Sequence, residues 1–227
     1  VGVGWARYCP RGQRLPLFHD EPCLRAPRRR HPLAAPRCTR HHAASPFAPF
    51  PTLPMKIITC PHDRHAAEIL AIFNEAIVTS TALFDYQPRT PATMLAWFEA
   101  KAEGGFPVLG VEGADGRLLG FASYGTFRTW PAYKYSVEHS VYVHQHHRGK
   151  GIGRMLMQAL IELARQQDYH LLIGCIEAGN VGSIALHESL GFKHAGTIQQ
   201  AGFKFGRWLD VSFYQLVLPT PANPCDG

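Results

Sequence analysis

The sequence predicts a mixed α/β fold, in which a central β-sheet of parallel and antiparallel strands carries helices on both faces. Two observations support this prediction. Between residues 55 and 218, apolar runs of strand length alternate with longer segments whose apolar residues recur every three or four positions. A glycine-rich turn at residues 149–153 also joins one such run to an amphipathic helix. The predicted order is one strand, two helices, three strands, a helix, a strand, a helix and two strands.

Capping and turn residues divide the first half of this order. Thr90-Pro91 opens a helix that Gly104-Gly105 ends, and Ala114-Asp115-Gly116 is a hairpin signal. The predicted elements are a strand at 55–60, a helix from 62 to a loop at 79–89, a helix at 90–103, and strands at 107–111 and 118–124.

Glycine and proline mark the boundaries of the second half. Gly191 closes the last helix, and Pro219, Pro221 and Pro224 forbid regular structure after Leu218. The predicted elements are strands at 137–144 and 171–176, helices at 154–167 and 183–190, and two final strands at 196–199 and 208–218.

Residues 1–54 differ from the rest of the chain in composition. They hold nine Arg against two acidic residues, a charge of +7, which leaves −1 for the remainder of a chain whose net charge is +6. They also hold ten of the eighteen prolines and show no sustained apolar period, so we expect them to be disordered. We expect the natural protein to begin at Met55; a basic arm that binds nucleic acid is the alternative. The domain is then residues 55–218, followed by a flexible tail at 219–227.

Composition and spacing also argue against several classes of protein. The apolar runs are far too short to span a bilayer, so no membrane partner is expected. The six cysteines show no Cys-x-x-Cys spacing, which indicates neither a zinc site nor a disulfide framework and favours the cytoplasm. His144, His146 and His147 lie together but have no carboxylate or Cys at ligand spacing, so no metal is expected.

The glycine-rich turn predicts a site for a pyrophosphate. Its glycines allow successive N–H groups to point into one concavity, the following helix N-terminus adds partial positive charge, and Arg148 and Lys150 add full charges. The NTPase phosphate loop requires Gly-Lys-Ser/Thr, whereas Lys150 is followed by Gly151, and the dinucleotide fingerprint lacks its spacing and its acidic residue. The pattern that fits is Arg-x-x-Gly-x-Gly, at Arg148, Gly151 and Gly153.

This pattern resembles the acetyl-coenzyme A loop of the GCN5-related N-acetyltransferases, and the predicted order of elements matches their fold. The resemblance implies that a bulge in the strand before the loop frees N–H groups of Val141 and Val143 for the thioester carbonyl and the pantetheine arm. The residues implied to bind acetyl-CoA are Val141, Tyr142, Val143, Arg148, Gly149, Lys150, Gly151, Ile152, Gly153, Arg154, Asn180 and Ser183.

Acetyl transfer to an amine requires a base, and Glu138 is the candidate, since it lies in the strand just before the loop. A solvated or salt-bridged carboxylate is the alternative. His187 stands where the family commonly has a Tyr near the coenzyme sulfur, so it either donates a proton to the thiolate or hydrogen-bonds the coenzyme. Asn180 resembles the family's Asn that contacts the coenzyme arm; a helix cap is the alternative.

Six segments in order look like the phosphinothricin (methionine sulfoximine) N-acetyltransferases. They are residues 73–77, 80–84, 137–143, 148–153, 186–188 and 202–211. The resemblance implies a homodimer that acetylates the α-amine of a small amino acid or analogue of the phosphinothricin, methionine sulfoximine or methionine sulfone type. Two alternatives remain, a peptide or protein N-terminal acetyltransferase and a non-catalytic acyl-CoA-binding protein.

The same resemblance assigns substrate-binding residues. Arg128 matches the position expected to meet the substrate carboxylate, which a guanidinium can hold in a bidentate manner. Thr129 stands beside it, and Arg89 is a weaker candidate. Phe84 and Trp130 are expected to wall the pocket, unless they are ordinary core aromatics.

Overall fold

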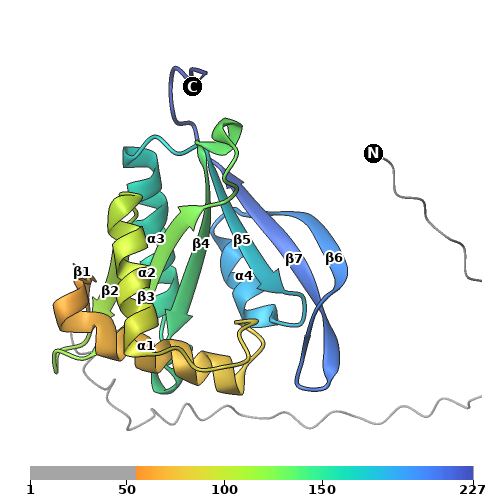
Figure 1. Ribbon diagram of the computed structural model, residues 1–227. Helices are drawn as coiled ribbons and strands as arrows, with labels where there is room; N and C mark the ends of the chain where they lie inside the picture. Colours follow the sequence, from red (N-terminus) through yellow and green to blue (C-terminus); the bar gives the residue numbers. More distant parts are fainter. Residues whose placement is uncertain (1–54, 227) are drawn as a thin grey trace, which may run out of the picture. The chain divides into compact units, whose positions relative to one another are not determined.

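The computed structural model describes residues 55–226, which form a seven-stranded mixed sheet with helices on both faces, as predicted (Figure 1). The strand order is β1-β2-β3-β4-β5-β7-β6, and β4 and β5 are its parallel pair. The elements are β1 (Lys56–Thr59), α1 (His62–Thr79), α2 (Pro91–Glu103), β2 (Val108–Glu112), β3 (Leu118–Thr126), η1 (Pro131–Tyr133), β4 (Ser136–Val143), η2 (Gln145–His147), α3 (Ile152–Gln166), β5 (Leu171–Glu177), α4 (Val181–Ser189), β6 (Lys193–Lys204) and β7 (Arg207–Val217).

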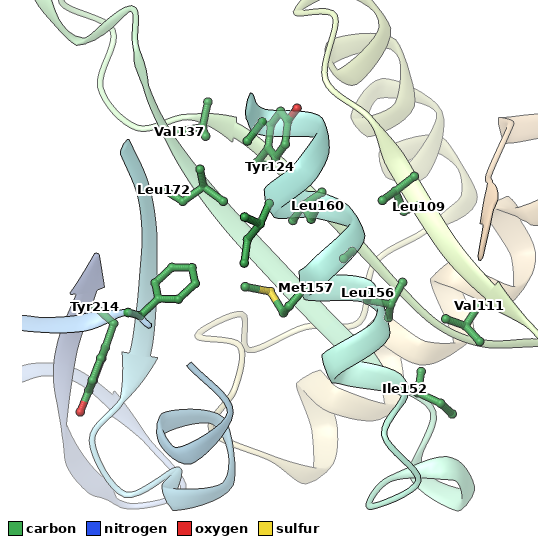
Figure 2. Packing of buried hydrophobic residues seen from close by; sticks show 14 of the residues in the cluster. Leu109, Val111, Tyr124, Val137, Ile152, Leu156, Met157, Leu160, Leu172 and Tyr214 are labelled. Atoms are coloured by element: carbon green, nitrogen blue, oxygen red, sulfur yellow. The ribbon is translucent and has the colours of Figure 1, made fainter. Parts of the chain in front are cut away.

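Each face of the sheet has its own apolar core. On one face α3 directs Leu156, Met157 and Leu160 against strand residues such as Val137 and Leu172 (Figure 2). These side chains recur at three- and four-residue spacing, which is why one face of the helix is fully buried. On the other face α1 and α2 pack a second cluster against β2 and β3, which contains Ile69, Ile72, Phe73, Met94, Phe98 and Phe121.

Two helices begin earlier than predicted because their caps lie before the first apolar residue. Gly151 adopts the left-handed conformation, with φ of 81°, and α3 starts directly after it at Ile152. Asn180 accepts a hydrogen bond from the Ser183 N–H at 3.1 Å, so α4 starts at Val181. Asn180 therefore caps this helix, and its contact with the coenzyme arm stays a prediction.

Strand β6 is much longer than the predicted segment at 196–199. Glycines interrupt its apolar alternation, and the ladder with β7 shifts register between His194 and Gly196 and again between Ile198 and Gly202. The strand continues through both irregularities, which periodicity cannot reveal. It ends in a two-residue turn at Phe205 and Gly206, where both φ angles are positive, as hairpin turns of this length require.

Strands β4 and β5 pair over only part of their length. Their register runs from Ser136 opposite Leu171 to His139 opposite Gly174, and beyond that point the two strands diverge (Figure 1). The partner ladder between β3 and β4 keeps one register from Thr126 to Gly120. The predicted bulge in β4 is therefore wrong: separation from β5 leaves the last residues of β4 with an unpaired edge.

The ends of the chain complete the description. Residues 1–54, for which disorder and an upstream origin were predicted, lie outside the described residues. Residues 219–226 contain no helix or strand, and Thr220 Oγ1 donates to the Tyr169 carbonyl at 2.6 Å while the Cys225 N–H donates to the Tyr135 hydroxyl at 3.2 Å. Within residues 55–226, no helix is both long and apolar enough to cross a membrane.

Candidate active site

A cleft of about 890 Å³ opens where β4 and β5 separate. Its walls are the end of β4, the glycine-rich loop, the first turns of α3 and α4, and the segment after α1. All the residues predicted to bind the coenzyme except Lys150 line it, namely Val141, Tyr142, Val143, Arg148, Gly149, Gly151, Ile152, Gly153, Arg154, Asn180 and Ser183.

The glycine-rich loop presents bare main chain to this cleft. Gly149 and Gly151 have φ angles of 76° and 81°, and a Cβ added to either would meet no atom of the described residues within 4 Å. No side chain of residues 55–226 caps the N-terminus of α3, so its first N–H groups point toward the loop without a side-chain acceptor from this part of the chain. The loop therefore offers open space, backbone donors and the positive end of a helix, which together suit a diphosphate.

The two cationic side chains of the loop are used differently from the prediction. Arg148 donates to Glu75 Oε2 at 2.5 Å and to the Val143 carbonyl at 3.1 Å, so it ties the loop to α1 and β4. Lys150 donates to the His146 carbonyl at 2.9 Å and does not line the cleft. Both charges stay near the loop, but neither ammonium nor guanidinium is without a partner.

A second, smaller pocket of about 210 Å³ adjoins the inner end of the cleft. The two share Val141, Tyr142 and Glu177 among their lining residues, so they are adjacent. Glu138 from β4 and Phe84 from the loop after α1 lie in this smaller pocket, which we call the acceptor pocket. The structure thus places the predicted base at the end of the coenzyme cleft.

Glu138 is half-buried in the acceptor pocket, and its carboxylate is not hydrogen-bonded to another described side chain. Burial raises its pKa above the ordinary value, and the nearby Arg128 guanidinium partly opposes that rise. A carboxylate with a raised pKa is a stronger base than one in water. The solvated-carboxylate alternative does not describe this environment.

His187 is buried at the back of the acceptor pocket and bonds a second histidine. Its Nδ1 lies 2.7 Å from the Ser183 carbonyl oxygen, which fixes the proton on Nδ1, and its Nε2 lies 2.8 Å from His139 Nε2. His139 must then donate through Nε2. Burial lowers the pKa of both rings, that of His139 to about 3, so the pair is neutral. Gly174 makes room for it, since a Cβ there would lie 3.1–3.2 Å from both rings.

The remaining predicted substrate residues do not line the acceptor pocket. Arg128, Thr129 and Trp130 line a separate hollow of about 170 Å³, and Trp130 is 72% exposed. The Arg128 guanidinium stacks on the Phe127 ring, with 4.5 Å between its Cζ and the ring centroid. The structure therefore unites Glu138 and Phe84 but not the predicted carboxylate clamp. Arg89 is also occupied, by an ion pair with Asp85 at 2.9 Å.

One acidic residue of the site, Glu177, was not predicted from the sequence. Glu177 ends β5, is almost fully buried, and lines both the cleft and the acceptor pocket. Its Oε2 accepts a hydrogen bond from Thr81 Oγ1 at 3.1 Å, and Arg207 Nη1 lies 3.8 Å from its Oε1. A strand end just before a helix cap was the available signal, because strand ends at a sheet opening commonly carry site residues.

Comparison with known proteins identifies the family of this chain. Residues 68–192 match the acetyltransferase (GNAT) family. The chain is 49% identical over 157 residues to an L-methionine sulfoximine/L-methionine sulfone acetyltransferase of Pseudomonas paraeruginosa, covering 69% of this chain and 91% of the relative. It is 36% identical over 154 residues to a phosphinothricin N-acetyltransferase of Alcaligenes faecalis, covering 67% of this chain and 78% of that protein.

A solved structure agrees with both. An acetyltransferase from Salmonella typhimurium, determined with its cofactor acetyl-CoA, superposes with a TM-score of 0.72 at 41% identity. The match covers 76% of this chain and 98% of that one. The chain therefore belongs to the acetyltransferase (GNAT) family, and its coenzyme is acetyl-CoA.

Proposed function

We propose that this enzyme transfers the acetyl group of acetyl-CoA to the α-amine of a small amino acid or analogue. The observation that carries the proposal is the acceptor pocket, a space of about 210 Å³ that ends the coenzyme cleft at Glu138. That volume suits an amino acid better than a peptide chain. The relatives named for methionine sulfoximine, methionine sulfone and phosphinothricin suggest analogues whose side chain ends in a tetrahedral oxygen-bearing group.

The residues of the cleft fit acetyl-CoA, which supplies an acetyl group activated as a thioester. The bare loop at Gly149 and Gly151 and the uncapped start of α3 are suited to its diphosphate. The unpaired edge of β4 at Val141 and Val143 offers main-chain groups to the pantetheine amides and the thioester carbonyl. Separation of two parallel strands therefore supplies the donors that the predicted bulge was expected to free.

Glu138 is the proposed base. Amino acids carry an ammonium group at neutral pH, and a nucleophile forms only when one of its protons leaves. The Glu138 carboxylate accepts that proton directly or through one water molecule. Its raised pKa, caused by burial, brings it closer to the pKa of the amine and makes the transfer less uphill.

For His187 the structure supports a positioning role over the proposed role as acid. Its Nδ1 proton is engaged by the Ser183 carbonyl and its Nε2 accepts from His139, so the ring has no free N–H to donate to a thiolate. The ring instead joins the first turn of α4 to β4, the two walls of the space that holds the acyl end. The two walls keep their separation because the histidine pair is both packed and hydrogen-bonded.

We further propose a homodimer in the cytoplasm. Hairpin β6–β7 exposes the large apolar side chains of Ile198, Phe203, Phe205 and Trp208, and contiguous exposed apolar surface commonly marks a protein–protein contact. The cysteines at 60, 175 and 225 are free thiols, which a reducing compartment preserves. Light scattering after size exclusion tests the dimer, and a monomer at micromolar concentration would refute it.

The activity is tested with a panel of amino acids, methionine sulfoximine, methionine sulfone, phosphinothricin and short peptides, each incubated with acetyl-CoA while free thiol release is followed. We expect turnover with amino-acid analogues and little with peptides. Preference for peptides would favour an N-terminal acetyltransferase. Tight acetyl-CoA binding without thiol release on any amine would leave a coenzyme-binding protein as the alternative.

A further inference from the structure

The segment between α1 and α2 separates the two halves of the site. Ser80, Thr81 and Ala82 line the coenzyme cleft, and Leu83 and Phe84 line the acceptor pocket. This segment contains no helix or strand. It is therefore held in place by its contacts with other elements. Thr81 bonds Glu177 of β5 and Arg89 bonds Asn74 of α1, and further contacts come from hairpin β6–β7, more than a hundred residues later in the chain.

Lys204 provides the central contact. It is the last residue of β6 and is buried, with 4% of its surface exposed. Its ammonium donates three hydrogen bonds to main-chain carbonyls, to Ile77 at 2.7 Å, Ser80 at 3.0 Å and Leu83 at 2.6 Å. Every N–H of the ammonium is thus used, two of them on the segment that walls the site and one on the last turn of α1.

The chemistry of this contact is specific for an ammonium group. No carboxylate among residues 55–226 lies within ion-pair distance of Lys204, so three carbonyl dipoles replace a counter-ion. The carbonyls of Ile77 and Ser80 belong to the end of α1, where the helix dipole is negative. A buried cation at this point stabilises the helix end and the segment that leaves it.

Two neighbouring contacts extend the same attachment. The hydroxyl of Tyr86 donates to the Phe203 carbonyl at 2.6 Å. The Phe84 ring lies against Gly202, where an added Cβ would be 3.0 Å from two ring carbons. Three successive residues of β6 therefore dock onto the segment that carries the wall of the acceptor pocket.

We propose that Lys204 is a positioning residue for the amino-acid substrate: it fixes residues 80–84 against hairpin β6–β7 and so sets the shape of the acceptor pocket. The inference rests on the proposed function, because the acceptor pocket is taken to hold the amino acid. It assigns Lys204 no contact with substrate or coenzyme. Its influence passes through the main chain of Ser80 and Leu83.

The test compares Lys204→Met, which keeps the length of the side chain but removes its donors, with Lys193→Met at an exposed lysine of the same strand. We expect Lys204→Met to raise KM for the best amino-acid substrate about tenfold, while the dissociation constant of acetyl-CoA changes less than about threefold. Hydrogen exchange at residues 80–86 should accelerate in Lys204→Met alone. Lys193→Met should match the natural chain in all three measurements.

A second variant covers the case in which Lys204→Met does not fold. Gly202→Ala leaves the ammonium in place but presses on the Phe84 ring, so it should produce the same selective rise in KM. Equal KM for the amino acid in both variants and the natural chain would overturn the inference, as would an equal loss of affinity for both substrates. Absence of turnover in the natural chain would instead refute the proposed function, and hydrogen exchange would still report whether Lys204 holds the segment.

Discussion

The coenzyme cleft and the acceptor pocket share lining residues but differ in the chemical groups that they present. The cleft presents main-chain groups: two glycines with positive φ, an uncapped helix start and the unpaired edge of β4. The acceptor pocket is formed by titratable side chains, among them Glu138, Glu177 and His187. The cleft therefore suits the coenzyme portion that all acyl-CoA molecules share, whereas the acceptor pocket is expected to select the amine and to accept its proton.

This difference predicts opposite sensitivities to substitution. In the cleft, a change matters when it alters backbone conformation, and side-chain truncation should matter little. In the acceptor pocket, single side-chain atoms should matter most, because a proton or a substrate group meets them directly. The following variants are ordered by expected effect, and each tests one side of that contrast.

Replacing Glu138 with Gln should have the largest effect. The amide keeps the shape of the side chain but cannot accept the ammonium proton, so kcat should fall about 100-fold. The dissociation constant of acetyl-CoA, measured by calorimetry, should stay within about twofold, because the coenzyme is held by main chain. An unchanged kcat would remove Glu138 as the base.

The pH dependence of the natural enzyme provides an independent check on Glu138. Burial raises its pKa above the ordinary value, and only the ionised form acts as a base. Activity should therefore fall as pH decreases through that raised pKa, and the fall should begin at a higher pH than for an exposed carboxylate. In Glu138→Gln the residual activity should lack this acidic limb.

Replacing Arg128 with Ala tests whether the hollow beside the acceptor pocket contributes to substrate binding. If the guanidinium meets the substrate carboxylate in the working enzyme, KM for amino acids should rise about tenfold, with KM for acetyl-CoA unchanged. Arg117→Ala, at an exposed hairpin arginine, is the matched control. An unaltered KM for amino acids would assign the carboxylate to another group.

On the cleft side, Gly151→Ala should weaken acetyl-CoA binding about fivefold, since a left-handed φ costs an L-residue about 1 kcal/mol and the loop would relax away from it. The added methyl group meets no atom within 4 Å, so a steric clash cannot account for the loss. Gly116→Ala imposes similar strain, at φ of 78°, in the β2–β3 turn. It should lower the free energy of unfolding by a similar amount while leaving acetyl-CoA affinity unchanged.

The same contrast explains how much of the site was predictable. The coenzyme loop is contiguous in sequence, and its glycines carry a backbone requirement that any fold must satisfy. The alternation of apolar runs likewise predicted the mixed sheet and the helices on its two faces. Those features depend on local spacing, which a sequence displays directly.

The acceptor pocket depends on contacts between distant segments, and spacing does not display them. Glu177 and Thr81 are ninety-six positions apart, and Lys204 reaches carbonyls more than one hundred and twenty positions earlier. The pairing of His139 with His187 occurs where β4 and β5 stop pairing, at His139 opposite Gly174. The bulge that the family resemblance implied for β4 was wrong, although strand separation frees the same edge of β4.

The smallest expected effect concerns the histidine pair behind the acceptor pocket. Burial holds the pKa of His139 at about 3 in the folded protein, below the value near 6.5 of an unfolded chain. The unfolded state therefore binds protons first as pH falls, so this group stabilises the fold above pH 6.5 and the stabilisation is lost below it. Between pH 7 and pH 6 the free energy of unfolding should drop by about 0.7 kcal/mol on account of His139.

Urea titrations of the natural chain and two variants at both pH values test this expectation. The drop should be smaller in His139→Phe, and in His146→Gln, whose side chain is exposed, it should equal that of the natural chain. An equal drop in all three proteins would mean that the pair is protonated in the folded state, and the neutral bridge between α4 and β4 would then be wrong.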